Sequence, residues 1–212
     1  MPVEWLYSPG LTPYDKALNL MEQRVQGIID GSAKELIWFL EHPPTYTAGR
    51  STEIKDILDI GKTPLFHVER GGRVTYHGPG QLVGYVMLDL RHRKKDVRHF
   101  VATLEQWIID SLRHFGINGE RRPGRIGIWT LDPATIPPQE KKIAALGLKL
   151  KKWVSYHGFA ININPDLSAF QKIIPCGIQN YGITSFASLG IEIPTTDLID
   201  RMKEKSGPLL TL

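Results

Sequence analysis

Two long segments of this chain carry apolar residues at helical spacing, and the remaining apolar residues come in short runs broken by glycine and proline. The first segment begins at Thr12-Pro13, where a capping residue precedes a proline at the first helical position, and it ends at Gly31. The second runs from Val97 to Phe115. The pattern predicts two amphipathic helices, each of which has to bury its apolar stripe against another element.

The short apolar runs are typical of strands, and the alternation of Leu148 to Lys151 indicates a half-solvated one. The predicted strands span residues 36–40, 65–68, 74–76, 82–90, 126–131, 143–154 and 158–163. A Pro-rich loop at 132–140 and short helices near 167–173 and 196–205 complete the chain. We therefore expect one α+β domain over residues 1–212, in which a mixed sheet carries flanking helices.

The composition favours a globular protein of the cytoplasm. Hydrophobic residues make up 42% of the chain and charged residues 23%, and no run of 18 apolar residues exists to span a membrane. The N-terminal residues resemble neither a secretory signal nor a transit peptide. A single cysteine excludes an intramolecular disulfide and fits a reducing compartment. We expect no membrane partner.

The net charge of +4 is unevenly distributed. Residues 91–152 hold 14 Lys and Arg against 6 Asp and Glu, a net charge of +8, so the rest of the chain is acidic. A basic block of this kind attracts nucleic acid, an anionic membrane or an acidic protein, and it is also compatible with a merely solvated face. Charge alone does not choose among these partners.

Three segments combine residues that carry chemistry. In the first, residues 70–81, five glycines and prolines within twelve positions force turns and bring backbone close to another group or to a ligand. In the second, Lys141-Lys142 enters the apolar run that starts at Ile143. Such lysines usually lie on a solvated edge, but an ammonium that is partly desolvated becomes able to exchange a proton near neutral pH.

The third segment is the Pro175-Cys176-Gly177 turn. A lone cysteine is most often a small buried hydrophobe, but a turn can direct its sulfur into a cleft. A thiol near its ordinary pKa of about 8.5 is only slightly ionised at neutral pH, so catalysis needs a partner. Lys142, His77 and His157 are the candidates, and the residues themselves do not rank them.

Together these segments resemble the signature blocks of the octanoyltransferase family, also called lipoate-protein ligase B. The resemblance is carried, in the family's order, by the strings RGGRVTYHGPGQL, KKIAALGLKLKKWVSYHGFAININPDL and IIPCG. The interval from Lys142 to Cys176 is also similar to the family's.

The resemblance implies the fold of biotin and lipoate protein ligases, with Cys176 as the acyl-thioester nucleophile and Lys142 as the group that lowers the pKa of its thiol. Gly147 and Gly177 are expected to neighbour the oxyanion donors. The acyl-binding residues implied by the family are Arg70, Gly71, Gly72, Arg73, Val74, Thr75, Tyr76, His77, Ala145, Leu146, Gly147, Gly158, Phe159 and Ala160.

The same resemblance implies an octanoyl-[acyl-carrier-protein]:protein N-octanoyltransferase, which opens endogenous protein lipoylation and needs no cofactor, metal or ATP. The implied donor is octanoyl-acyl carrier protein. The implied acceptors are the lipoyl domains of 2-oxoacid dehydrogenase acyltransferase subunits and the glycine cleavage H protein. These are typically acidic proteins, so the basic block is interpreted as a steering surface for them rather than for nucleic acid. We expect a monomer.

Three alternatives give different expectations. An ATP-dependent lipoate or biotin-type protein ligase on the same fold needs an adenylate-binding loop and has no use for Cys176. A cysteine hydrolase that pairs Cys176 with His77 or His157 releases free acid without an acceptor. A non-enzymatic basic module binds nucleic acid with an affinity that falls as salt rises.

Overall fold

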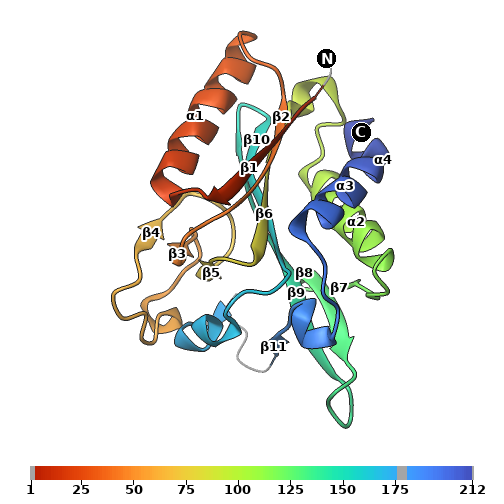
Figure 1. The fold of residues 1–212 in the computed structure, drawn as a ribbon. Helices are drawn as coiled ribbons and strands as arrows, with labels where there is room; N and C mark the ends of the chain where they lie inside the picture. The colour runs from red at the N-terminus through yellow and green to blue at the C-terminus, as the bar shows by residue number, and fades with distance from the viewer. Residues whose placement is uncertain (1–2, 176–180, 212) are drawn as a thin grey trace.

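A mixed sheet forms the middle layer of the molecule, in the strand order β1-β2-β6-β10-β9-β8-β7 (Figure 1). The structure is a computed structural model that describes residues 3–175 and 181–211. Neighbouring strands are antiparallel, except that β1 runs parallel to β2 and the short β11 runs parallel to β9. The strands of this sheet are β1 (Glu4–Leu11), β2 (Leu36–Glu41), β6 (Gln81–Met87), β7 (Glu120–Arg122), β8 (Arg125–Asp132), β9 (Gln139–Lys151), β10 (Val154–Asn162) and β11 (Gly182–Ile183).

Helices cover both faces of the sheet (Figure 1). Helix α1 (Tyr14–Asp30) lies on one face, and α2 (Val97–Arg113), α3 (Thr195–Glu204) and α4 (Gly207–Leu210) lie on the other. A small second sheet stands beside the α1 end in the order β4-β3-β5. Its strands are β3 (Thr45–Ala48), β4 (Leu65–His67) and β5 (Thr75–His77). The 3-10 helices given for the described residues are η1 (Ile54–Asp56), η2 (Leu90–His92), η3 (Leu167–Lys172) and η5 (Ala187–Leu189).

The two faces of the central strands enter separate cores. In β6, Leu82 and Val86 pack with the α2 side, while Val83 and Tyr85 pack with the α1 side. Every residue of β6 and β10 is buried, so both faces of these strands are covered. Burial on both faces also fixes the register, because a slip of one residue would exchange the two sets.

Glycines bring β6 and β10 into unusually close contact. A Cβ atom at Gly158 would lie 1.9 Å from the carbonyl oxygen of Gly84, and one at Gly84 would lie 2.1 Å from the ring of Phe159. Neither position has room for any side chain. The Phe159 ring occupies the space beside Gly84, whereas Gly158 lines the cavity described below.

The α+β architecture predicted from the sequence is confirmed, with differences in detail. Helix α1 begins at Tyr14, and Pro13 rather than Thr12 occupies the cap position. The predicted strands 143–154 and 158–163 form the β9–β10 hairpin, whose turn residues Lys152 and Trp153 have positive φ angles of 48° and 67°. Segment 167–173 folds as a 3-10 helix rather than an α-helix.

Four strands were missed by the sequence analysis, and each has a reason. Strand β1 contains Pro9 and Gly10, β3 follows directly after a Pro-Pro pair, β7 is a charged three-residue edge, and β11 has only two residues. None of them has the uninterrupted alternation that identifies a strand. Within the described residues, no helix has both the length and the apolarity to cross a membrane.

We expect Gly158→Ala to lower the free energy of unfolding by roughly 1–3 kcal/mol, because the added methyl group overlaps the Gly84 carbonyl and must push β6 and β10 apart. Urea denaturation measures the change. Gly207→Ala is the matched control, since a Cβ atom there meets nothing within 4 Å. Equal stability of the two variants would contradict the close-approach argument.

Candidate active site

A cavity on the α1 side of the sheet brings together the three segments expected to bind an acyl group. Water-sized groups have about 50 Å³ of room inside it, and the space including its open mouth is about 510 Å³, so it is a narrow cavity. Its lining comprises Arg70, Gly72, Arg73, Thr75, His77, Ala145, Leu146, Gly147, Gly158, Phe159 and Ala160, together with Tyr14, Val83, Tyr85 and His157. The last four come from α1, β6 and β10, and only His157 had been singled out in the sequence.

Three residues of the predicted set lie outside this lining. Val74 and Tyr76 are buried in a separate apolar cluster with Tyr46 and Phe170. The backbone N–H of Gly71 donates to the carbonyl of Leu148 at 2.9 Å. These residues therefore attach the glycine-rich segment to η3, β3 and β9 instead of facing the cavity. Alternation along β5 explains the outcome, since neighbouring residues of a strand point to opposite sides.

The buried guanidinium of Arg70 holds the glycine-rich segment in place. Its Nη1 donates to the carbonyls of Gly71 and Arg73, both at 3.0 Å, and its Nη2 donates to the carbonyl and the hydroxyl of Thr47, both at 2.8 Å. Gly49 and Gly147 leave room for the side chain, because a Cβ atom at either would approach Arg70 to 3.0 Å or less. Arg70 thus ties a loop to β3 as well as lining the cavity.

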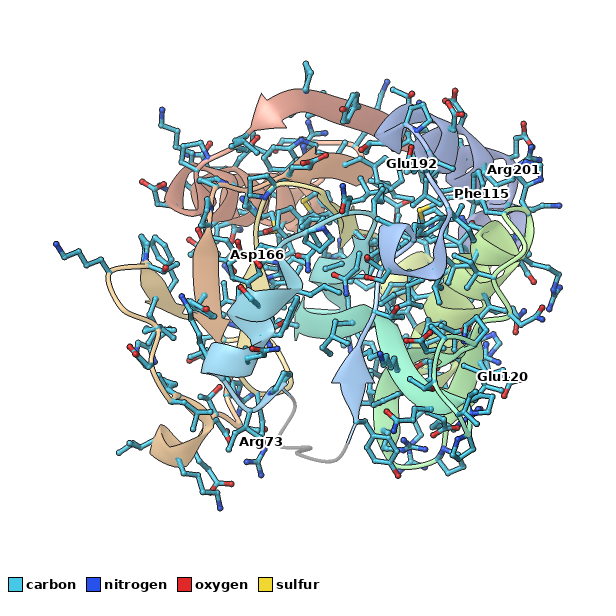
Figure 2. The ribbon with its side chains drawn as sticks, turned by 60° about the horizontal axis from the view of Figure 1, so that its bottom comes forward. Arg73, Phe115, Glu120, Asp166, Glu192 and Arg201 are labelled. Atoms are coloured by element: carbon cyan, nitrogen blue, oxygen red, sulfur yellow. The ribbon has the colours of Figure 1, made fainter. Side chains whose placement is uncertain are left out.

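The second arginine of this segment is paired with acids. Arg73 contacts Glu53 at 2.7 Å and the buried carboxylate of Asp56 at 3.0 Å. Figure 2 shows Arg73 on the side of the small sheet, opposite Glu120 and Arg201. Both arginines of the glycine-rich segment are therefore engaged by groups of the protein itself.

From Thr47 a line of hydrogen bonds crosses beneath the cavity. His77 Nδ1 lies 2.7 Å from Gln81 Oε1, and its Nε2 lies 3.3 Å from the Thr47 hydroxyl. Gln81 donates to Asn162 Oδ1 at 2.9 Å. Asn162 donates in turn to the carbonyl of Thr184 at 2.9 Å. Because Gln81 Oε1 is an acceptor, His77 carries its proton on Nδ1, and both of its ring nitrogens are occupied by structural contacts.

This line of hydrogen bonds ends beside Lys142. The backbone N–H of Thr184 donates to the carbonyl of Lys142 at 2.9 Å, and Ile183 of β11 is in register with the same lysine. Lys142 is only 4% exposed, and its Nζ lies 4.8 Å from the ring centroid of Trp129. Gly127 makes room for its stem, since a Cβ atom there would lie 3.1 Å from Lys142 Cε. The lysine is therefore buried and not on a solvated edge.

Cys176 and Gly177 lie outside the described residues. The chain before them is fixed by a 2.7 Å hydrogen bond from the N–H of Ile174 to the carbonyl of Asp56. The chain after them is fixed at Tyr181, whose ring packs against Trp129 with centroids 5.4 Å apart. The pairing of Lys142 with the Cys176 thiol, which the family resemblance implies, thus stays a prediction.

Buried, uncharged rings surround the inner part of the cavity. Tyr85 donates to His42 Nε2 at 2.7 Å, because His42 Nδ1 faces the carbonyl of Thr12 at 2.6 Å and must carry the proton. Burial raises the pKa of Tyr14 to about 12. Burial lowers the pKa of His42 to about 4 and that of His77 and His157 to about 3. All four groups are neutral near pH 7.

The cations of the basic block do not form a uniform surface. Arg91 pairs with Asp89, Arg93 with Glu35, and Lys141 with Asp132. In the β7–β8 hairpin, Arg121 pairs with Glu105, and Arg122 and Arg125 both pair with Glu140. The described residues contain no group of three or more His, Cys, Asp or Glu side chains arranged to hold a metal ion.

Comparison with known proteins identifies the family. The lipoyl protein ligase A/B catalytic domain matches residues 13–206. The octanoyltransferase of Chelativorans sp. (strain BNC1) is 51% identical over 96% of this chain and 85% of its own length. That of Brucella melitensis biotype 1 is 53% identical over 93% of this chain and 76% of its own length. The chain belongs to the octanoyltransferase family.

The fold of this octanoyltransferase-family chain is shared with ligases. A bipartite lipoate protein ligase from Thermoplasma acidophilum superposes with a TM-score of 0.72 over 99% of this chain and 84% of its own, at 15% identity. Lipoate-protein ligase A bound with ATP gives 0.72 over 99% and 86%, at 17% identity. A biotin protein ligase from Aquifex aeolicus gives 0.54 over 98% and 69%, at 12% identity. These matches confirm the expected ligase-like fold.

The three buried histidines make the octanoyltransferase-family fold sensitive to acid. Below about pH 6.5 the unfolded chain binds protons on His42, His77 and His157, whereas the folded protein does not until pH 4 or 3. The free energy of unfolding should therefore fall as pH decreases through this window, by roughly 1.4 kcal/mol per pH unit for each histidine. Urea denaturation from pH 7.5 to 4.5 measures the slope.

His42→Gln should reduce the slope of unfolding free energy against pH by the contribution of one histidine, roughly 1.4 kcal/mol per pH unit. His67→Asn, at an exposed histidine, is the matched control and should leave the slope unchanged. If both variants behaved like the parent, the buried histidines would not be the groups that couple stability to pH.

Proposed function

We propose that this chain, as a single catalytic domain, transfers an octanoyl group from acyl carrier protein to the acceptor lysine of lipoyl domains. The observation that carries the proposal is the cavity itself. It gathers the three predicted acyl-binding segments, and one of them lies on β9, the strand that also holds the buried Lys142. Burial of an eight-carbon chain in such a cavity contributes roughly 5 kcal/mol, at about 0.8 kcal/mol per methylene.

The engaged arginines favour a transferase over an ATP-dependent ligase. A ligase needs cations in the glycine-rich segment to meet the phosphates of an adenylate. Here Arg70 donates to backbone carbonyls and to Thr47, and Arg73 is paired with Glu53 and Asp56. The identity of 51–53% to octanoyltransferases, against 15–17% to the lipoate ligases of similar fold, points the same way.

In the first half of the proposed reaction, Lys142 accepts the thiol proton of Cys176 and the thiolate attacks the carbonyl carbon of the octanoyl thioester. The new S–C bond forms as the bond to the carrier sulfur breaks. The leaving carrier thiolate takes the proton back from Lys142. Octanoyl then remains on Cys176 as a thioester.

In the second half, the ε-amine of a lipoyl-domain lysine attacks the Cys176 thioester and Lys142 accepts the proton that the amine loses. An amide bond forms as the S–C bond breaks, and the cysteine thiolate recovers its proton. Because an amide is more stable than a thioester, the transfer runs downhill without ATP. Lys142 is suited to both halves because β9, β11 and Trp129 fix its position.

The donor and the acceptors that we propose are acidic proteins, the octanoyl-acyl carrier protein, the lipoyl domains of 2-oxoacid dehydrogenase acyltransferase subunits and the glycine cleavage H protein. Half of the basic block is already neutralised by acids of this chain, so the steering surface has to be smaller than the whole block. Lys94, Lys95 and Arg98 are exposed around the start of α2 and supply cations for it.

The thioester intermediate gives the direct test. Incubation with octanoyl-acyl carrier protein should add the mass of one octanoyl group to the protein, and hydroxylamine should remove it. Cys176→Ala and Cys176→Ser should abolish both the adduct and transfer to a lipoyl domain while the fold is retained. Near-normal transfer by Cys176→Ala would exclude the covalent route, and ATP consumption with free octanoate would favour a ligase.

The role of Lys142 is tested by Lys142→Arg, which keeps the charge but cannot accept a proton. We expect transfer to fall by about 100-fold or more, a loss typical of a missing general base. His77→Gln is the comparison, because His77 makes structural contacts with Gln81 and Thr47 and should cost less activity. Full activity of Lys142→Arg, measured as octanoylation of a lipoyl domain, would contradict the assignment.

A further inference from the structure

His157 adopts a backbone conformation that is unusual for a residue within a strand. Its φ angle is +60°, although it lies in the middle of β10. The pairing of β10 with β6 is irregular here, because the Ser155 hydroxyl accepts from the N–H of Leu88 and donates to the carbonyl of Val86. A residue with a Cβ atom is disfavoured in the left-handed region, and such residues are found where the surrounding structure imposes them, often at ligand sites.

This conformation changes the face from which the imidazole projects. Regular alternation would place Tyr156 and Gly158 on the α1 side and the residue between them on the α2 side. Instead His157 lines the cavity, and its ring stacks on Tyr156 with centroids 4.9 Å apart and an interplanar angle of 22°. Tyr156 belongs to the α1-side core. The positive φ angle therefore directs the ring of His157 into the acyl cavity.

The ring of His157 faces the cavity as an uncharged wall. It is 2% exposed, and burial, with Arg70 and Lys149 nearby, lowers its pKa to about 3. Among the described residues no hydrogen-bond partner of its ring is found, unlike His42 and His77. A neutral ring can lie against a hydrocarbon chain without a charge that would have to be desolvated.

Along β9 and β10, small residues that line the cavity are followed by the His157 ring. Moving along β9 away from Lys142, Ala145 is paired with Ala160 and Gly147 with Gly158. The next pair is Leu148 with His157. Leu148 lies six positions from Lys142 along β9, which corresponds to roughly 20 Å along an extended strand. The His157 ring lines the cavity at one end of this interval and Lys142 lies at the other end of it, so the interval has the scale of a medium-length acyl chain.

We propose that His157, turned into the cavity by its left-handed backbone, is the end wall that sets the length of the acyl chain this protein accepts. The inference rests on the proposed function, because the reacting end of the chain is placed beside Lys142. The ligand class is a saturated acyl group whose last methyl group contacts the imidazole.

His157→Gly tests the proposal, since glycine keeps the left-handed backbone without strain and removes the wall. The test compares transfer rates from octanoyl-, decanoyl- and dodecanoyl-acyl carrier protein to a lipoyl domain. We expect the ratio of decanoyl to octanoyl kcat/KM to rise by about tenfold, because two further methylenes become buried. His157→Asn, a smaller residue that tolerates positive φ, should give a lesser change in the same direction.

Lys152→Gly is the matched control. Lys152 also has a positive φ angle, of 48°, but it is exposed at the hairpin turn and does not line the cavity. It should leave the length profile unchanged. A parent-like length profile in folded His157→Gly and His157→Asn would overturn the inference. Absence of octanoyl transfer by the parent protein would instead overturn the proposed function, and calorimetric binding of octanoate and dodecanoate to parent and His157→Gly would still report on the wall.

Discussion

The cavity depends on the hydrogen bonds of one buried guanidinium. Arg70 holds the turn of the glycine-rich segment to Thr47 of β3, and the N–H of Gly71 holds the same turn to β9. These bonds join the small sheet to the large sheet at the wall of the cavity. The planar fork of arginine suits this task because it satisfies several acceptors at fixed angles, which a lysine ammonium cannot do. The line of hydrogen bonds from Thr47 to Thr184 then connects β3 to β9, the strand that holds Lys142.

The two faces of the central strands differ in how they are packed. Gly84 and Gly158 allow close contact of β6 and β10, and the α2 face of the same strands is filled by Phe159 and its neighbours. The α1 face keeps an open cavity where β9 and β10 contribute the small residues Ala145, Gly147, Gly158 and Ala160. The α2 face therefore contributes packing that stabilises the fold, and the α1 face contributes the cavity.

The sequence predicted much of this arrangement, and what it missed has physical reasons. Helical spacing and apolar runs located α1, α2, β6, β9 and β10, since tertiary packing and local pattern agree there. The family resemblance selected the three cavity segments, but it did not separate lining residues from supporting ones such as Val74 and Tyr76. The contribution of Tyr14 and Tyr85 arises from contacts between distant elements, which local spacing does not encode.

The alternation of faces along β6 and β10 has a consequence for how the protein can vary. Residues that point to α2 pack in the core, whereas their neighbours that point to α1 line the cavity, which Phe159 of the α2-side core also reaches. Substitutions at adjacent positions of a single strand therefore act on different properties. Selection can adjust heat tolerance through Val86 and Ile161 and substrate range through Val83 and Ala160 with little interference between the two. Stability and substrate range can therefore change separately within one strand.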